Sequence, residues 1–354
     1  MMSMVRTPTV MAVACLAALA LGAGSARAAD EPSAQRDLTP AAAKALDSGI
    51  AWLVRTQNQD GSWLSDGSTG MFPTAITALA GLALLGEGNT CYSGPHASNV
   101  RRAVEYLLHQ ADPQTGLIGG YEGGRPMFGH GFAMLFLAQV YGTEGQEDLH
   151  ERIRAVLTKA ISLTAGSQSE LGGWYYTPGS TEDEGAVTVT QMQGLRACAD
   201  AGLPVPAATV TNAMAYIRRA ANPDGGIAYR AGVPGESRPG ITCAALAVMY
   251  AAGLYQDKLV ADGLDYAKRT VSTRAPTLAG GAHFFYTHMY LSQVLYFRGG
   301  ADWSDYFSGL RNWLVEAQRE DGSWNGDNLG TAYGTCIAVL ILQLPLNNMP
   351  VYQR

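Results

Sequence analysis

The acidic run Glu182-Asp183-Glu184 has the most direct chemical potential in this sequence. It stands immediately before an apolar stretch that we expect to be helical. A carboxyl group drawn into such an apolar site stays protonated and can act as a general acid. The alternative is a solvated or capping cluster, because carboxylates also stabilise a helix N-terminus. Asp183 and Glu184 are therefore candidate catalytic residues.

Two histidines are further candidates for catalysis. His130 stands at the start of an expected apolar helix, where it could face a central cavity. The alternative is a cap or a hydrogen-bonded core histidine. His288 lies eleven residues before Gly299, and Cys243 lies ten residues before Gly253. If both glycines end helices, the two side chains lie at similar depth on neighbouring helices.

These candidates stand on a unit that recurs at a period near 50 residues, which is typical of stacked or closed repeats. The unit is clearest in two turns near the ends of the chain, Gln57-Asn58-Gln59-Asp60-Gly61-Ser62-Trp63 and Gln318-Arg319-Glu320-Asp321-Gly322-Ser323-Trp324. Weaker turns are Asp112 to Tyr121, Gly172 to Tyr175, Asn222 to Gly226 and Gly280 to Phe284. We interpret the repeated glutamine and tryptophan as structural, since they can satisfy helix ends and cover seams.

Each turn separates two kinds of helix. The segment before it has apolar residues three and four apart, which predicts an amphipathic outer helix. The segment after it is apolar nearly all round, which predicts a buried inner helix. The clearest inner segments are Ala75 to Leu85, Phe132 to Tyr141, Cys243 to Ala252 and Tyr333 to Leu344. Each of the six inner segments is predicted to end at a glycine, which accepts a left-handed conformation, or at a proline. These residues are Gly86, Gly142, Gly202, Gly253, Gly299 and Pro345.

Six such hairpins cannot bury their inner faces unless they pack on one another. An open stack would need atypical polar repeats at its ends, whereas the first and last units here are the most complete copies. We therefore expect a closed ring. The predicted fold class is all-α, a six-hairpin α/α toroid spanning one domain, 37–354.

In these turns and apolar helices the sequence resembles squalene and oxidosqualene cyclases and the β subunits of protein prenyltransferases. The resemblance covers all six units, and the first and last turns are close matches. A narrower likeness is to secreted bacterial prenyltransferase-like proteins of unassigned activity, which share endings like Asn348-Met349-Pro350-Val351-Tyr352-Gln353-Arg354. The resemblance implies the toroid fold and suggests an isoprenoid-type ligand.

The resemblance also implies two chemistries whose motifs are incomplete here. Squalene-hopene-type cyclases protonate an alkene with an Asp-x-Asp-Asp acid, which this sequence lacks. Prenyltransferases hold zinc with Asp, Cys and His; here Ile241 stands where the family has the aspartate, and His288 is about one place off. Zinc on Cys243 and His288 stays one interpretation. The other is a buried free thiol beside a packed histidine.

Aromatic residues gather in and beside the turns. Aromatic faces can stabilise a carbocation, as in terpene cyclases, or simply fill space. We expect these side chains to line a central cavity and to bind substrate: Tyr121, Trp174, Tyr175, Tyr229, Phe284, Tyr286 and Tyr333.

Residues 1–28 are predicted to be a signal peptide. An apolar run from Val10 to Leu21 is followed by the small-x-small site Ala26-Arg27-Ala28. The run is shorter than the roughly 20 residues that span a bilayer, so we expect cleavage, export to the periplasm or beyond, and no membrane span afterwards. The alternatives are an uncleaved anchor and a lipoprotein modified at Cys15. Residues 29–36 are expected to be a short flexible segment.

The net charge and the cysteine positions exclude one class of partner and one disulfide. A net charge of -6 with 15% charged residues offers no basic surface for a phosphate backbone, so nucleic acid is not an expected partner. The helical register also sets Cys198 and Cys243 roughly 9 Å apart along the helix axis, too far for a disulfide.

Three functions remain open. The first is a toroid that takes an apolar isoprenoid or lipid ligand into an aromatic-lined cavity, as a cyclase- or prenyltransferase-like enzyme or as a carrier. The second is a non-catalytic scaffold that binds a polypeptide. The third is a carbohydrate-active toroid, which requires two carboxylates across a cleft.

Overall fold

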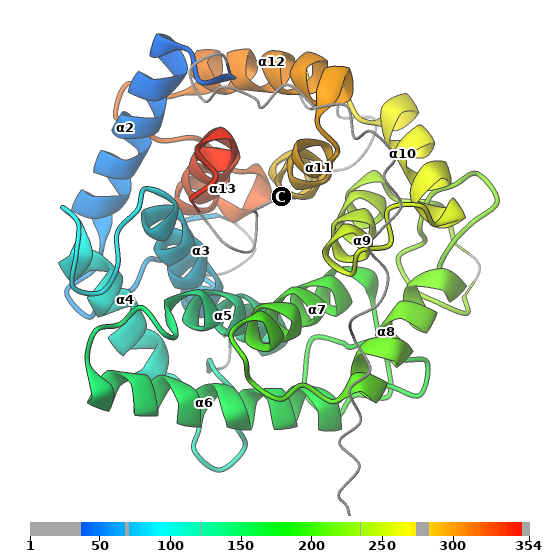
Figure 1. Ribbon diagram of the computed structural model, residues 1–354, viewed down its shortest axis with the longest axis horizontal. Coiled ribbons are helices and arrows are strands. Elements are labelled where there is room, and N and C mark those ends of the chain that lie inside the picture. Colours follow the sequence, from blue (N-terminus) through cyan, green and yellow to red (C-terminus); the bar gives the residue numbers. More distant parts are fainter. Residues whose placement is uncertain (1–36, 68–70, 121, 234, 274–282, 349–354) are drawn as a thin grey trace, which may run out of the picture. The chain divides into compact units, whose positions relative to one another are not determined.

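Helices that are amphipathic alternate along the chain with helices that are apolar on every side, and the two kinds form two concentric sets (Figure 1). This is a computed structural model that describes residues 37–348 apart from 68–70, 121, 234 and 274–282. These residues contain twelve α-helices, and no helix among them is long and apolar enough to cross a membrane. The predicted signal peptide and the segment 29–36 lie outside the described residues.

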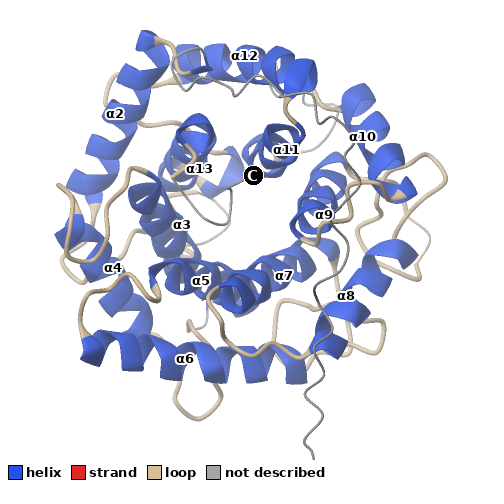
Figure 2. Cartoon of the chain, in the orientation of Figure 1, coloured by secondary structure: helices blue, strands red, loops and turns tan. Residues whose placement is uncertain are grey.

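The outer helices are α2 (Pro40–Thr56), α4 (Ala97–His109), α6 (Glu147–Gly166), α8 (Ala207–Arg219), α10 (Lys258–Thr270) and α12 (Gly300–Ala317). The inner helices are α3 (Pro73–Gly86), α5 (Pro126–Val140), α7 (Gly185–Asp200), α9 (Pro239–Ala251), α11 (Phe284–Arg298) and α13 (Thr331–Gln343). Short 3-10 helices are η1 (Glu122–Gly124), η3 (Asp327–Leu329) and η4 (Leu344–Leu346). Figure 2 shows the loops that join them.

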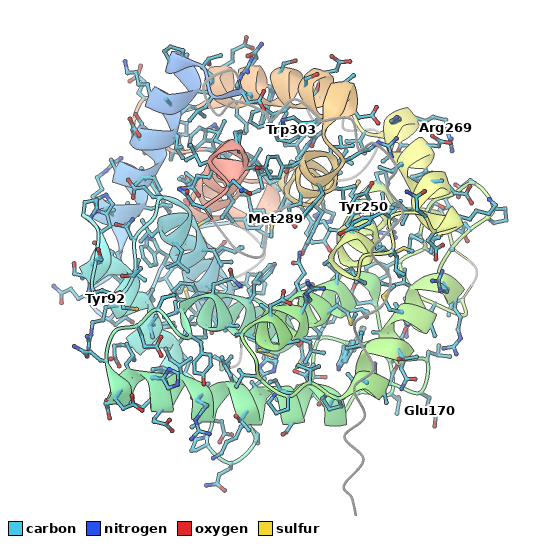
Figure 3. The ribbon with its side chains drawn as sticks, viewed as in Figure 1. Tyr92, Glu170, Tyr250, Arg269, Met289 and Trp303 are labelled. Carbon is cyan, nitrogen blue, oxygen red and sulfur yellow. The ribbon has the colours of Figure 1, made fainter. Side chains whose placement is uncertain are left out.

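Burial follows this division. Outer helix α4 buries one stripe that includes Val100, Ala103 and Leu107, whereas every residue of inner helix α13 is buried. In Figure 3, Met289 of α11 lies toward the interior of the ring and Arg269 of α10 lies on its outside. The predicted all-α, six-hairpin toroid is confirmed.

Several helix ends differ from prediction, and α9, which begins at Pro239 and not at Cys243, is one of them. Helix α5 begins at Pro126, six residues before the predicted Phe132, because proline at the first helical position needs no hydrogen-bond partner for its nitrogen. Gly86 is the last residue of α3, and the left-handed conformation falls on Gly88 instead (φ 98°). Glu87 still has a right-handed backbone, so the chain turns away from the helix only at Gly88.

In the five hairpins whose turns are described, the turn packs on the outer helix that follows it, and we call these contacts the seams. At three seams a glutamine side chain donates to its own turn and to the next outer helix. Gln57 Nε2 donates to the carbonyl of Gly61 (2.9 Å) and to that of Asn99 (3.0 Å). Gln168 repeats this with Gly172 and Thr209. A polar residue that bridges two hairpins in this way fixes their relative position.

The last seam closes the ring. Gln318 Nε2 donates to the carbonyl of Gly322 (2.9 Å) and to that of Ala45 in α2 (2.8 Å). Gly322 is left-handed (φ 89°), and a Cβ there would stand 2.6 Å from the carbonyl oxygen of Ser48. At Gly49 of α2, a Cβ would stand 2.8 Å from the indole of Trp324, so the ring packs directly on this glycine. The closed ring predicted from the first and last units is therefore present.

The described cysteines form no disulfides. Cys91, Cys198, Cys243 and Cys336 are all buried free thiols. Burial raises the pKa of Cys243 to about 12, so its sulfur stays protonated and apolar in character.

Candidate active site

The N-termini of the inner helices lie together at one end of the ring, which we call the rim. The link between neighbours is the same each time: the turn of the next hairpin accepts a hydrogen bond from the first turn of the helix before it. Glu122 Oε1 accepts from the Thr74 amide of α3 (2.7 Å), and the Tyr176 carbonyl accepts from the Met127 amide of α5 (3.1 Å). These bonds satisfy donors that a helix leaves free at its start.

The same link is found at three other inner helices. The acceptors are the Tyr229 carbonyl for Gly185 of α7, Asp327 for Phe284 and Phe285 of α11, and Asp66 for Thr331 of α13. The last of these again joins the final hairpin to the first. The rim is thus built from turns that are far apart in sequence.

Glu184 is the most deeply buried acid of the rim, with a side chain that is 0% exposed. It is the N-cap of α7 and accepts from the amides of Ala186 (2.8 Å) and Val187 (2.6 Å). Burial raises its pKa from 4.5 to about 7, against the opposing effect of these bonds, of Tyr229 and of Arg125. Its proton is therefore available for transfer near neutral pH.

Half-buried tyrosines stand beside this carboxyl group. The hydroxyl of Tyr229 is hydrogen-bonded to that of Tyr176, and the ring of Tyr176 lies 4.4 Å from that of Tyr175, centroid to centroid. Tyr229 also bonds to Glu184, which favours the ionised form of the acid. The cluster joins the turns before α7 and α9 around Glu184.

A second, half-buried acid lies on the side of the rim formed by α11 and α13. Asp327, in η3, adopts a left-handed backbone (φ 48°), and its two oxygens accept from the amides of Phe284 and Phe285 (3.1 Å each). Burial raises its pKa to about 6. It belongs to a different hairpin from the helix that it caps.

Tyrosines of α11 and α13 interact with each other and with these two acids. Tyr286 packs on Tyr290 with ring centroids 4.9 Å apart. Burial raises the pKa of Tyr286, and the charges of Tyr290, Glu184 and Tyr333 raise it further. The pKa of Tyr333 is raised by burial and then by Asp327. Tyr286 is thus within electrostatic reach of Glu184, and Tyr333 within reach of Asp327.

Two predicted site residues, Asp183 and Trp174, prove to have structural contacts. Asp183 is buried and accepts from the Ser169 hydroxyl of its own turn (2.8 Å). Trp174 is 1% exposed and donates from its indole to the Thr164 carbonyl (2.7 Å). The indoles of Trp63 and Trp324 make the same bond to their own outer helices.

His130 takes the place of a structural threonine. In four other hairpins a turn amide donates to a threonine of the following inner helix: Thr77, Thr188, Thr242 and Thr335. In α5 the Ile118 amide donates instead to His130 Nδ1 (3.0 Å), which leaves Nε2 to donate to the Thr164 hydroxyl (3.0 Å). Burial lowers the pKa of His130 to about 4. His130 is therefore a neutral core residue, which matches the alternative of a hydrogen-bonded core histidine.

The proposed zinc ligands do not form a metal site. His288 is buried, with Nδ1 on the Tyr306 hydroxyl (2.7 Å) and Nε2 on the Ser272 carbonyl (3.2 Å). Both nitrogens are therefore occupied, and burial lowers the pKa of the ring to about 4. No group of three His, Cys, Asp or Glu side chains within the described part of the chain is placed to hold a metal ion. Cys243 and His288 fit the buried thiol and packed histidine.

The remaining predicted aromatic residues are divided between two places. Phe284 packs on His288 (4.2 Å between centroids) and on Trp313 (4.3 Å), toward the outer helices. Tyr121 lies outside the described residues. Tyr175, Tyr229, Tyr286 and Tyr333 are therefore the predicted binding residues that the structure places at the rim.

Glu122 and Asp327 are rim residues that the sequence did not reveal. Each caps a helix of another hairpin, and each adopts a left-handed backbone that is unusual for a residue with a side chain. The one sequence signal is their setting among glycines, in Gly119-Gly120-Tyr121-Glu122-Gly123-Gly124 and Gly326-Asp327. Tyr176 was also missed, although it stands next to Tyr175.

The architecture is that of a terpenoid-cyclase-like α/α toroid. The type II terpene cyclase MstE from Scytonema superposes with a TM-score of 0.59 at 15% identity, covering 86% of this chain and 97% of the cyclase. Its complex with the substrate geranylgeranyl dihydroxybenzoate gives 0.58 at 14% identity, with 88% and 98% covered. The α-1,6-mannanase GH76A of Salegentibacter sp. HEL1_6 gives 0.61 at 8% identity, with 85% and 98% covered. No family model and no curated protein sequence matches the chain. At these identities the likeness establishes the fold alone.

Proposed function

We propose that this protein binds an apolar isoprenoid-type ligand at the rim and that Glu184 protonates it. The observation that carries the proposal is a buried carboxyl group with a pKa of about 7, set among half-buried tyrosines. The structural likeness to a cyclase whose complexes hold a geranylgeranyl substrate and its product supports the ligand class.

The proposed step is an acid-initiated rearrangement. An alkene is a weak base, so its protonation needs a carboxylic acid that burial keeps protonated. The Glu184 hydroxyl would give its proton to one alkene carbon, leaving a carboxylate and a carbocation. The ring faces of Tyr229 and Tyr286 would stabilise the cation. Loss of a proton from the rearranged cation would form the product and restore the acid.

The test replaces one acid and keeps its neighbour as a control. We expect Glu184→Gln to retain a polyprenoid that co-purifies with the wild type in native mass spectrometry, and to convert none of it. Glu182→Gln makes the same chemical change at an exposed residue two positions away and should leave conversion unchanged. Conversion by Glu184→Gln at the wild-type rate would exclude Glu184 as the acid. A wild type that binds no polyprenoid would contradict the proposal as a whole.

The carbohydrate alternative rests on a specific observation. A solved complex of an inactive mannanase variant, in which two consecutive aspartates are replaced, holds α-1,6-mannotriose, and Asp183 and Glu184 are also consecutive acids. Here Asp183 faces Ser169, so a second carboxylate would have to come from elsewhere on the rim, such as Asp327. Release of reducing sugar from α-linked mannooligosaccharides by the wild type, lost in Glu184→Gln, would favour this function over the first.

Export stays a proposal drawn from the sequence. If residues 1–28 are a signal peptide, the mature protein begins at Ala29. N-terminal sequencing of protein secreted from a Gram-negative host would show that residue first. A chain that retains Met1 in the cytoplasm would contradict it. A polypeptide partner is the outcome that remains if neither lipid nor sugar binds.

A further inference from the structure

Two arginines begin the inner helices on either side of Glu184. Arg125 is the N-cap of α5 and Arg238 the N-cap of α9, and neither makes a side-chain capping bond. A helix N-terminus carries partial positive charge and normally takes an acidic or neutral cap. A guanidinium at that position is therefore unfavourable by itself. Both side chains are exposed, so burial does not explain why they stand there.

The tyrosine cluster holds both guanidinium groups in place. The Cζ atom of Arg125 lies 4.8 Å from the ring centroid of Tyr176, and that of Arg238 lies 4.9 Å from the centroid of Tyr229. The hydroxyls of these two rings are bonded to each other. Each guanidinium group therefore lies over one of two joined rings, and this contact reduces the entropy that the arginine would lose on binding a ligand.

Neither arginine forms a salt bridge within the described part of the chain, although the charge of Arg125 reaches Glu184 and opposes the rise in its pKa. The ion pairs found there include neither Arg125 nor Arg238, whereas Arg230, on the same turn as Tyr229, pairs with Glu182 at 3.7 Å. Arg238 also lowers the pKa of His283, the N-cap of α11, second to burial. Both guanidinium groups thus lie at helix N-termini of the rim, and neither forms a salt bridge among the described residues there.

We propose that Arg125 and Arg238 bind an anionic head group at the end of the isoprenoid-type ligand. The inference rests on the proposed function, because it assigns the ligand's polar end at the same site. Phosphate or carboxylate oxygens suit it, since a guanidinium fork binds either by paired hydrogen bonds and the helix N-termini add to the attraction. The apolar chain would then extend from the arginines past Glu184 toward Tyr286.

The experiment compares one chain with three end groups. Isothermal titration of the full protein with farnesol, farnesoic acid and farnesyl monophosphate separates the apolar chain from the charge. We expect the wild type to bind both anions at least about tenfold more tightly than farnesol, because charge-assisted hydrogen bonds are among the stronger ones. The tighter of the two anions identifies the head group as carboxylate or phosphate.

The variants show whether the two arginines are responsible. Arg125→Gln and Arg238→Gln should each lose about tenfold in affinity for the anions and none for farnesol. Arg→Lys at either position should recover part of the loss, since it keeps the charge but not the planar fork. Arg154→Gln on outer helix α6 is the matched control, with the same change of charge on an exposed side chain.

Each outcome has a distinct meaning. Equal affinity of the wild type for farnesol and the anions would overturn the head-group site and leave the proposed function standing. An equal loss in Arg154→Gln would overturn it too, because the effect would then be general charge. No binding of any of the three would overturn the proposed function and this inference with it.

Discussion

The seams and the rim are built from the same turns but differ in whether their polar groups have hydrogen-bond or ion-pair partners. At the closing seam Gln318 has a partner in each of the two hairpins that it joins. At the rim, Glu184 is buried at the cost of a raised pKa, and Arg125 and Arg238 stand without a carboxylate partner among the described residues. Fully satisfied polar groups stabilise a fold, whereas perturbed ones gather where a protein binds or reacts. The difference separates structure from function in this ring.

Trp324→Ala should give the largest effect, and on stability alone. The indole is 0% exposed and bonded to the Leu314 carbonyl (2.7 Å), so its removal leaves a cavity and an unpaired acceptor. We expect a loss of about 3–5 kcal/mol in the free energy of unfolding in urea. Trp313→Ala, at a half-buried position of outer helix α12 where the ring packs on Phe284, should cost about 1–2 kcal/mol. If the two cost the same, the seam is not the structural element that we describe.

Gly322→Ala tests whether the ring is closed. Gly322 and Gly142 have nearly the same φ, 89° and 90°, but a Cβ would meet Ser48 only at Gly322. Both substitutions should cost the roughly 1–2 kcal/mol of a left-handed residue. Gly322→Ala should cost a further 1–3 kcal/mol or so from overpacking, measured by urea unfolding. Equal losses at the two positions would mean that the first and last hairpins do not meet as described.

Glu184→Gln should change the pH dependence of stability. The folded pKa of Glu184 is raised, so its contribution is complete below 4.5 and is lost as pH rises through about 7. The wild type should therefore lose stability relative to the variant between pH 5 and 8. His130 and His288, with lowered pKa values, reduce stability as pH falls toward 4 in both proteins, so they cancel in the difference. A difference that does not vary with pH would place Glu184 in solvent.

The fold was predictable and the rim was only partly so. Motifs such as Gln57 to Trp63 act within one hairpin and its neighbour, so the sequence carries their pattern directly. Glu122 and Asp327 cap helices of other hairpins through unusual backbone conformations, and the glycines around them do not show which helix each one caps. Arg125 and Arg238 resemble any exposed arginine until the ring brings them onto tyrosines of other turns. Glu184 was found because its position before an apolar helix is a local signal.

Tyr229→Phe should give the smallest effect of this series. The Tyr229 hydroxyl favours the ionised form of Glu184, so its removal should raise the pKa of Glu184 further, by about one unit or less. The matched change Tyr255→Phe alters an exposed hydroxyl on the opposite end of α9 and should leave that pKa unchanged. A fall in the pKa of Glu184 in Tyr229→Phe would contradict the hydrogen bond.

The most direct test of the account is the titration of Glu184 itself. Carbon-13 NMR of protein labelled at the glutamate carboxyl carbon should show one resonance that titrates near pH 7 and is missing from Glu184→Gln. That result would establish a buried acid that keeps its proton at neutral pH, as the proposed chemistry requires. If the resonance lost in Glu184→Gln titrates near pH 4.5 instead, the rim holds an ordinary capping carboxylate and the account of its function is wrong.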